Sequence, residues 1–229
     1  MTRIDIQKEE LIMTEREAIT LRHSVRKYQD KPIDPETLAL LSERIDLVNE
    51  KYGLHVQYIP EEGGVFSGVV SKICGWSGIP GYLAMVGRDD EGLDELCGYA
   101  GEQLVLFAQT IGLNTCWAGI FKRKRCTAKV SENEGLALVI AVGYGVDNGH
   151  PRRSKKIEDV TDVQDMPDWF RDGIEAALLA PTARNQQKFF ITLDGEDPAA
   201  RVTGNAPFAK LDLGIVKYHF EVGSGRKIF

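Results

Sequence analysis

The run LALVIAV at residues 136–142 is the part of the sequence that indicates the fold most clearly. A short, uninterrupted apolar run of this length is typical of a buried strand. The wider apolar stretch, Gly135 to Val146, is too short to cross a bilayer. We therefore predict a buried strand here and interpret the rest of the chain around it.

The elements predicted on either side of this strand are a mixture of helices and strands. Further strands are predicted at 55–59, 82–86 and 189–193. Helices are predicted at 14–22, from Asp34-Pro35 onward, at 93–111, at 168–179 and after Lys210. The segments 60–81 and 147–156 are predicted to be loops. They follow no regular βαβ rhythm, so we predict an α+β fold with a mixed central sheet flanked by helices. Two organisations are open: a single domain over residues 1–229, or two pseudo-repeated halves, about 1–150 and 151–229.

Length and composition indicate an intracellular globular protein. The chain has 229 residues, 43% of them hydrophobic, and a formal net charge of -6, which argues against nucleic-acid binding. The amino-terminal residues contain no apolar run of signal-peptide type, and we expect a cytoplasmic protein with no membrane segment. The four cysteines (Cys74, Cys97, Cys116, Cys126) are irregularly spaced, so we expect reduced thiols and no metal site.

The segment Leu21 to Tyr28, LRHSVRKY, is the first that can carry chemistry. In an extended chain Arg22, Ser24 and Arg26 point to one face, where two guanidinium groups and a hydroxyl can grip a phosphate. The alternative is a solvated helix end whose basic residues complement the helix dipole.

Two further segments are candidates for a binding loop. In APTARNQQ, residues 180–187, small side chains permit close approach to a flat ring and Asn185 can donate and accept, although an ordinary helix-to-strand turn has the same composition. In GLNTCWAG, residues 112–119, a backbone N–H can face a ligand, while Trp117 is equally consistent with core packing and Cys116 is expected to be structural.

The remaining charged and imidazole side chains carry weaker signals. The basic clusters at 122–125 and 152–156 are either solvated surfaces or phosphate contacts, and the second is the better candidate. His55, His150 and His219 have no partner spacing and are expected to be structural.

Together these segments resemble the nitroreductase family of FMN enzymes. Residues 22–28 are similar to that family's Arg-x-Ser-x-Arg-x-aromatic motif, residues 180–187 to its Ala-Pro-Ser-x-x-Asn-x-Gln segment, and residues 112–119 to its Gly-Leu-x-x-x-Trp-x-Gly turn. The stretch from Pro151 to Val160 resembles the basic stretch and acidic helix that follow.

The resemblance implies FMN as cofactor and assigns a set of contacts to it. Arg22, His23, Ser24 and Arg26 would contact the phosphate and ribityl chain, with Arg153 and Lys155 as weaker phosphate contacts. The flavin would be lined by Pro181, Thr182, Ala183 and Asn185, and its ring would lie near Trp117, Ala118 and Gly119.

One departure from the family pattern concerns the order of the motifs. In most of the family the Ala-Pro-Ser-x-x-Asn segment comes early and continues with Pro-Trp, whereas here it lies in the C-terminal half and continues with Lys188-Phe189. A smaller branch of nitroreductases shares this order. The usual homodimer and a pseudo-dimeric monomer, whose two halves imitate two subunits, are therefore both open.

The activity that the resemblance implies is ping-pong electron transfer. NAD(P)H would reduce the flavin, leave, and be replaced by a small acceptor such as a nitroaromatic or a quinone. No catalytic side chain is required. One alternative is a flavin-binding sensor or carrier without turnover, and another keeps the fold but carries out flavin destruction or reductive dehalogenation.

Overall fold

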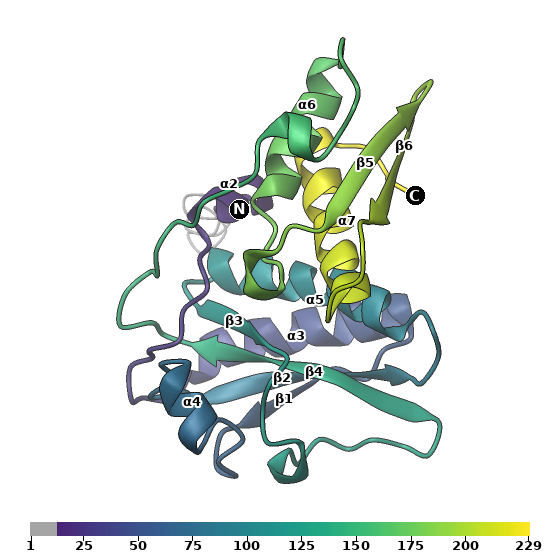
Figure 1. Cartoon of the computed structure of the whole chain (residues 1–229). Helices are drawn as coiled ribbons and strands as arrows, with labels where there is room; N and C mark the ends of the chain where they lie inside the picture. The colour runs from purple at the N-terminus through teal and green to yellow at the C-terminus, as the bar shows by residue number, and fades with distance from the viewer. Residues whose placement is uncertain (1–12) are drawn as a thin grey trace, which may run out of the picture.

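Four antiparallel strands form the central sheet in the order β1 (Gln57–Pro60), β2 (Gly81–Arg88), β4 (Glu134–Gly143) and β3 (Asn114–Ala118) (Figure 1). This computed structural model describes residues 13–229, so the amino-terminal stretch that we expected to lack a signal peptide lies largely outside the described residues. The run at 136–142 falls within β4, which lies between β2 and β3, and the prediction of a buried strand is confirmed.

Helices and a separate hairpin complete the fold. The helices are α2 (Glu15–Leu21), α3 (Pro35–Tyr52), α4 (Val69–Ile73), α5 (Leu93–Thr110), α6 (Asp168–Leu178) and α7 (Ala209–Ser224), and the hairpin consists of β5 (Phe189–Asp194) and β6 (Asp197–Val202). Three 3-10 turns lie at η1 (Arg123–Arg125), η2 (Ile157–Asp159) and η3 (Ala183–Asn185). The predicted α+β class is confirmed, but the central sheet is antiparallel rather than mixed. Among residues 13–229, parallel pairing is found only in isolated bridges such as Ser24 with Thr115.

The sheet is buried on both faces, which explains why its central strands are apolar throughout. On β2, Leu83 and Met85 face the main core with α3 and α5, while Tyr82, Ala84 and Val86 face a second cluster. Side chains of successive strand residues point to opposite faces, so a strand covered on both sides carries no polar alternation.

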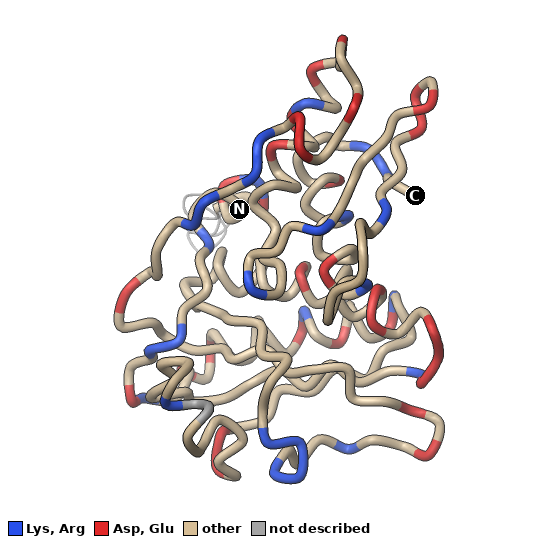
Figure 2. The backbone as a smooth tube through the Cα atoms, in the orientation of Figure 1, with Lys and Arg blue, Asp and Glu red and all other residues tan. Residues whose placement is uncertain are grey.

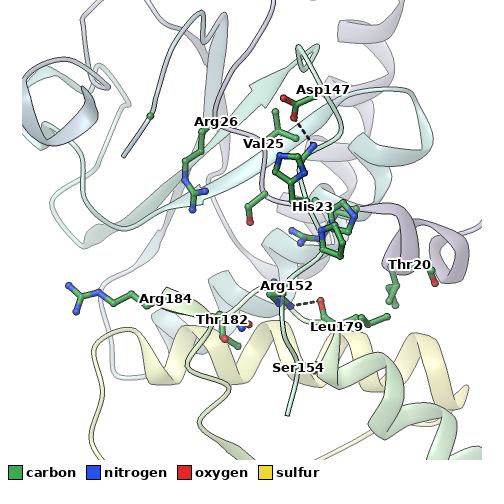
Figure 3. A pocket seen from close by; sticks show the side chains of 18 of the residues that line it. Thr20, His23, Val25, Arg26, Asp147, Arg152, Ser154, Leu179, Thr182 and Arg184 are labelled. Carbon is green, nitrogen blue, oxygen red and sulfur yellow. Dashed lines mark hydrogen bonds between the residues drawn. The ribbon is translucent and has the colours of Figure 1, made fainter. Parts of the chain in front are cut away.

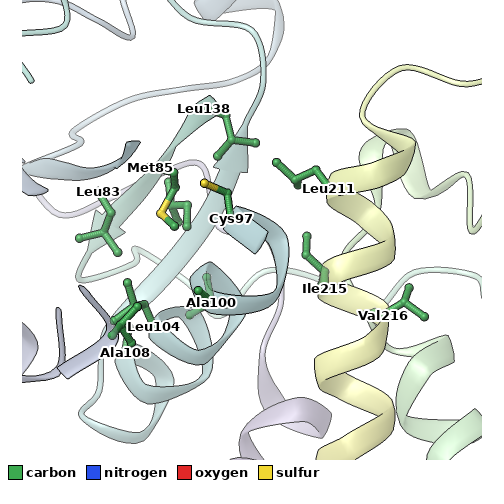
Figure 4. Packing of buried hydrophobic residues seen from close by; sticks show 14 of the residues in the cluster. Leu83, Met85, Cys97, Ala100, Leu104, Ala108, Leu138, Leu211, Ile215 and Val216 are labelled. Carbon is green, nitrogen blue, oxygen red and sulfur yellow. The ribbon is translucent and has the colours of Figure 1, made fainter. Parts of the chain in front are cut away.

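Helix α7 packs on the side of α5 that faces away from the sheet, and two glycines bring these helices together (Figures 1 and 4). A Cβ on Gly98 would lie 2.0 Å from the Leu211 carbonyl oxygen, and one on Gly214 would lie 2.0 Å from that of Glu95. Around this contact Cys97 meets Leu211 and Ile215 in one apolar layer. The close packing fixes the position of α7 and of the loop before it.

Helix boundaries agree with the signals in the sequence. Thr14 and Glu17 form the predicted capping box, and the Asp34 side chain caps α3 at its Pro35 end. After α5 the chain turns at Gly112, whose φ of 80° is in the left-handed region that glycine adopts readily.

Three elements differ from the prediction. The glycine-rich segment 60–81, predicted as loop, contains the short helix α4. The 114–118 segment, predicted only as a small-residue turn, is strand β3, and β6 was not predicted because Asp197-Pro198 has the composition of a turn. β6 is stabilised from outside its own sequence, since the Ala200 N–H donates to the Phe229 carbonyl of the chain terminus.

Among residues 13–229, no helix combines the length and apolar character needed to span a membrane. Within the same residues, no three potential His, Cys, Asp or Glu ligands are grouped so that they could hold a metal ion.

Candidate functional site

The segment Arg22 to Tyr28 runs alongside β3 after α2 ends. Ser24 forms a parallel bridge with Thr115, and the Val25 N–H donates to the Thr115 carbonyl at 3.1 Å. This pairing keeps the segment extended, and Arg22, Ser24 and Arg26 all line one cavity. The intervening residues His23, Val25 and Lys27 line it as well, so the predicted alternation does not separate cavity residues from the others.

The segment Ala180 to Gln187 has a strained backbone. Arg184, Asn185 and Gln187 have φ angles of 53°, 54° and 44°, in a region that residues with a Cβ rarely occupy. Within residues 13–229, Phe208 (φ 61°) is the other non-glycine residue in this region. Backbone strain of this kind is typical of ligand-binding sites, where the surrounding structure holds it in place.

Hydrogen bonds from three neighbouring elements hold the strained segment. The Gln187 side chain donates to Ser154 Oγ at 3.0 Å and to the Leu178 carbonyl at 2.8 Å, and it accepts from the Lys155 N–H at 2.8 Å. The Ala183 N–H donates to both carboxylate oxygens of Asp212 on α7, at 2.9 and 3.1 Å. The shape of this segment is therefore fixed before any ligand binds.

A cavity of about 650 Å³ lies between the two segments (Figure 3). His23 and Arg26 lie on one side of it and Thr182 and Arg184 on the other, with Arg152 between them. This volume is within the range of cofactor and small-molecule sites.

Two residues that line this cavity, Arg22 and Asn185, carry buried polar atoms without hydrogen-bond partners. The Arg22 side chain is buried, yet its Nε and Nη1 have no hydrogen-bond partner, and neither does Asn185 Oδ1. Leaving a buried donor or acceptor unpaired costs roughly 1–3 kcal/mol. A ligand with acceptors for Arg22 and a donor for Asn185 would remove this cost, and FMN has an anionic phosphate, hydroxyls and a ring N–H, so the residues present fit it.

Positive charge accumulates at the same cavity. Burial lowers the pKa of Arg152 to about 10, and the nearby Arg22 contributes to this shift. The pKa of His23 is lowered by burial and then by the charges of Arg22, Arg152 and His150. Cations that disfavour one another's charge would be stabilised by an anionic ligand between them.

The basic cluster at 152–156 contributes a different residue from those that the sequence indicated. Arg152 lines the cavity and donates to the carbonyls of Leu179 and Ala180, whereas the Arg153 side chain is exposed and its carbonyl accepts from Asn185 Nδ2 at 2.7 Å. The Lys155 ammonium group donates to the Gln187 carbonyl at 2.7 Å.

The other basic cluster, residues 122–125, lies at the far end of the molecule from residues 152–156 (Figure 2). Arg123 donates to the carbonyls of Leu136 and Ala137, and Arg125 donates to that of Gly63. These contacts hold the loop after β3 against the sheet.

Trp117, Ala118 and Gly119 lie at the end of β3 and do not line the 650 Å³ cavity. The Trp117 indole points inward and donates to Glu102 Oε2 at 2.9 Å. Gly119 is covered by the ring of Phe208, because a Cβ added there would lie 2.4 Å from Phe208 Cζ. Of the other predicted flavin contacts, Pro181 is buried and Ala183 is held by Asp212, while Thr182 and Asn185 face the cavity.

A buried pair that the sequence did not indicate lies behind Trp117. Glu102 on α5 and His219 on α7 are both fully buried, and His219 Nε2 lies 2.8 Å from Glu102 Oε1. His219 Nδ1 lies 3.0 Å from the Ala176 carbonyl, which can only accept, so this nitrogen carries a proton. The partners are 117 positions apart, which is why no spacing rule relates them.

Asp212 was also not predicted, although a sequence signal exists for it. It is a charged residue among apolar neighbours on α7, between Leu211 and Leu213. Such a residue in a buried helix needs a polar partner, and Asp212 has Ala183 and Gln186, the latter at 2.7 Å. Cys116, predicted to be structural, is buried, and burial raises the pKa of its thiol.

The fold and the cavity between residues 22–26 and 180–187 define a protein of the nitroreductase-like α+β class. The profile of the family described as "Putative TM nitroreductase" matches residues 15–224, so the chain belongs to this family. No match was found among curated protein sequences.

Solved structures share this fold. A "putative nitroreductase" from Thermotoga maritima is similar with a TM-score of 0.65 and 20% identity, covering 94% of this chain and 85% of that one. One from Desulfovibrio desulfuricans, in complex with FMN, has a TM-score of 0.54 and 18% identity over 68% of this chain and 99% of that one. A "putative NADH dehydrogenase/NAD(P)H nitroreductase" from Parabacteroides distasonis has a TM-score of 0.50 and 16% identity over 65% and 97%.

Proposed function

We propose that this chain binds FMN in the 650 Å³ cavity and acts as an NAD(P)H-dependent oxidoreductase on a small acceptor such as a nitroaromatic or a quinone. The observation that carries the proposal is that Arg22 and Asn185, two residues that line a positively charged cavity, have buried polar atoms without hydrogen-bond partners. Membership of the nitroreductase family and the FMN complex of the Desulfovibrio neighbour support the choice of cofactor.

The proposed contacts to FMN differ along the cavity, with cationic side chains at the phosphate and neutral polar side chains at the ribityl chain and the ring. Arg22 and Arg152 would bind the phosphate with charge-assisted hydrogen bonds, and Ser24 would contact the ribityl chain. Asn185 Oδ1 would accept a hydrogen bond from the flavin ring edge. Because the 180–187 segment is held by Asp212 and Gln187, these contacts would be preorganised.

When bound, FMN supplies hydride acceptance and electron donation, so no nucleophile or acid–base pair is required of the protein. The protein positions the ring and limits the access of water and substrates. With one cavity for the cofactor, the reduced nicotinamide and the acceptor would use the same exposed ring face in turn, which is the basis of a ping-pong scheme. The name of the Parabacteroides neighbour supports a nicotinamide as the donor.

A single chain supplies both walls of the cavity. One wall is formed by residues 22–26, which come before the sheet in sequence, and the other by residues 180–187, which follow α6. We therefore propose that one chain forms a complete flavin site and that its two halves take the places of two subunits. This arrangement does not require a homodimer. We further propose that the protein works in the cytoplasm, where reduced nicotinamides are available.

The direct test is anaerobic stopped-flow mixing of the FMN-loaded protein with NADH and with NADPH, followed by addition of a quinone. We expect the flavin absorbance to bleach with at least one nicotinamide and to recover with the quinone. Failure of both nicotinamides to bleach the flavin would contradict the enzyme assignment. Flavin binding without steady-state quinone reduction would favour a sensor or carrier.

A further inference from the structure

The cavity carries more positive charge than one FMN phosphate can balance. Its lining includes five basic residues and a single acidic one, Asp147; the basic residues are Arg22, Arg26, Lys27, Arg152 and Arg184. The Asp147 carboxylate accepts from the Gly149 N–H at 2.8 Å. A phosphate monoester carries a charge of about −2 at pH 7. The five cations therefore exceed Asp147 and the FMN phosphate together by about two charges.

The least exposed of these cations are the two that the proposed function assigns to the FMN phosphate. Arg22 is buried and Arg152 is half-buried, whereas Arg26, Lys27 and Arg184 are exposed. A cofactor that stays bound can use the buried pair. A substrate that enters from solvent and leaves again meets the exposed cations first, so the surplus charge lies where a second, transient ligand arrives.

Two of the exposed cations have no counter-ion. Among residues 13–229, the arginines in salt bridges are Arg16, Arg44, Arg88 and Arg226. Within that range Arg26 and Arg184 carry unpaired charges, and Figure 3 shows them at the same end of the cavity on opposite walls. An anionic group that binds there breaks no existing ion pair.

The backbone at Arg184 is fixed although its side chain is free. Its φ of 53° belongs to the strained segment. Both neighbours in sequence are held by other parts of the chain: the Ala183 N–H donates to Asp212, and Asn185 Nδ2 donates to the Arg153 carbonyl at 2.7 Å. The guanidinium of Arg184 is therefore attached to a rigid position on the cavity wall.

We propose that the electron donor is NADPH rather than NADH and that Arg184 binds its 2′-phosphate. The inference rests on the proposed function, because it requires a donor that uses the flavin cavity. The two nucleotides differ only by this phosphate monoester, whose charge of about −2 matches the surplus of positive charge. An unpaired guanidinium can form two parallel hydrogen bonds to a phosphate, and the charges of Arg26 and Lys27 add to the attraction.

The first test is anaerobic stopped-flow reduction of the FMN-loaded protein by each nicotinamide. The selectivity ratio is the apparent second-order rate constant for NADPH divided by that for NADH. It should be about tenfold or more in the wild type and less than about threefold in Arg184→Asn, since asparagine tolerates the positive φ but cannot supply the charge. Arg184→Lys should give an intermediate ratio, because an ammonium keeps the charge and loses the paired hydrogen bonds.

A second readout does not depend on electron transfer. Adenosine 2′,5′-bisphosphate and adenosine 5′-monophosphate differ only by the 2′-phosphate, and their dissociation constants can be measured by calorimetry on the oxidised, FMN-loaded protein. The bisphosphate should bind about tenfold more tightly to the wild type, and this advantage should disappear in Arg184→Asn. It should also shrink at higher ionic strength, because Arg184 is exposed.

Lys188→Asn is the matched control. Lys188 is exposed and close to Arg184 in sequence, but it does not line the cavity, and its ammonium group donates to the Asn205 carbonyl at 3.3 Å. Both of its ratios should equal those of the wild type.

Three results would contradict these expectations in different ways. A wild-type selectivity ratio below about threefold, with the flavin bleached by both nicotinamides, would overturn the inference and leave the proposed function intact. Wild-type ratios retained in Arg184→Asn would overturn the role of Arg184. Failure of both nicotinamides to bleach the bound flavin would overturn the proposed function itself.

Discussion

Two groups of buried polar side chains in this chain differ in whether their hydrogen bonds are complete. Between α5 and α7, Trp117, Glu102 and His219 form a chain of bonds of 2.9, 2.8 and 3.0 Å that ends on the Ala176 carbonyl. At the cavity, Arg22 Nε and Nη1 and Asn185 Oδ1 are equally hidden from water and have no partner.

This difference distinguishes side chains that stabilise the fold from side chains that bind a ligand. A complete network within a core contributes to the stability of the fold, whereas an incomplete one on a cavity wall lowers stability until a ligand completes it. Substitutions in the Glu102 network should therefore change folding more than ligand affinity. Substitutions at Arg22 should do the opposite, and the following predictions test this contrast.

The largest effect on folding is expected at Glu102. Glu102→Leu removes the acceptor of the Trp117 indole and the partner of His219, and should lower the free energy of unfolding by about 3–5 kcal/mol in urea denaturation. Glu102→Gln keeps both contacts, since its carbonyl accepts from Trp117 and its amide donates to His219 Nε2, and should cost about 1 kcal/mol. Equal losses in both variants would contradict the hydrogen-bond account.

The largest effect on binding is expected at Arg22. Arg22→Ala should weaken FMN binding about 100-fold in a fluorescence titration, because it removes a charge-assisted contact to the phosphate. Stability of the protein without FMN should stay the same or rise, since an unpaired buried guanidinium near Arg152 is lost.

The matched control for Arg22 is Arg16→Ala on the preceding helix. Arg16 is exposed and pairs with Asp172 at 2.7 Å, away from the cavity lining, so FMN affinity should not change. The contrast would be contradicted if Arg22→Ala bound FMN as tightly as the wild type and lost as much stability as Glu102→Leu. Arg22 would then contribute to the stability of the fold, as the Glu102 network does.

A smaller effect that depends on pH is expected at Asp212, which links α7 to the cavity wall. Burial raises the pKa of Asp212 from 3.8 to about 6, against the hydrogen bonds from Gln186 and Ala183 and the charge of Arg152. A raised pKa means that the folded state holds the proton more tightly, so the contribution to stability is present below pH 3.8 and is lost as pH rises through about 6.

Asp212→Asn should remove this pH dependence. The unfolding free energy of the wild type, minus that of the variant, should fall by about 1–3 kcal/mol across this pH range. Subtracting the variant cancels the titration of the other groups. A difference that stays constant with pH would show that Asp212 has an ordinary pKa.

The smallest effect is expected at Thr14, whose capping box begins the helix that leads into Arg22. Thr14→Ala should lower the free energy of unfolding by about 1 kcal/mol, measured by thermal denaturation. FMN affinity should change less than about threefold, because β3 pairing rather than α2 positions the cavity-lining segment. A large loss of affinity would show that α2 positions Arg22.

The elements that the sequence predicted correctly are those with local signals. Capping residues mark the starts of α2 and α3, and the apolar run at 136–142 marks β4. By contrast, β6 contains Pro198 and depends on contacts with the chain terminus, so local composition could not reveal it.

The same distinction applies to the site. The extended segment brings Arg22, Ser24 and Arg26 to one cavity, as local geometry led us to expect. Alternation did not single them out, because His23, Val25 and Lys27 line the same cavity. Arg152 acts through contacts with residues far away in sequence, and Glu102 meets His219 only because α5 packs on α7. Which residues fill a cavity is decided by tertiary packing, which local patterns do not contain.

The central claim is that the incomplete group of buried polar atoms is a flavin site. The most direct test is an absorption spectrum of the purified protein, followed by denaturation and chromatography of the released chromophore. The account predicts a yellow protein that releases FMN in equimolar amount, or a colourless one that takes up added FMN to that level. A colourless protein that takes up no FMN would contradict the account.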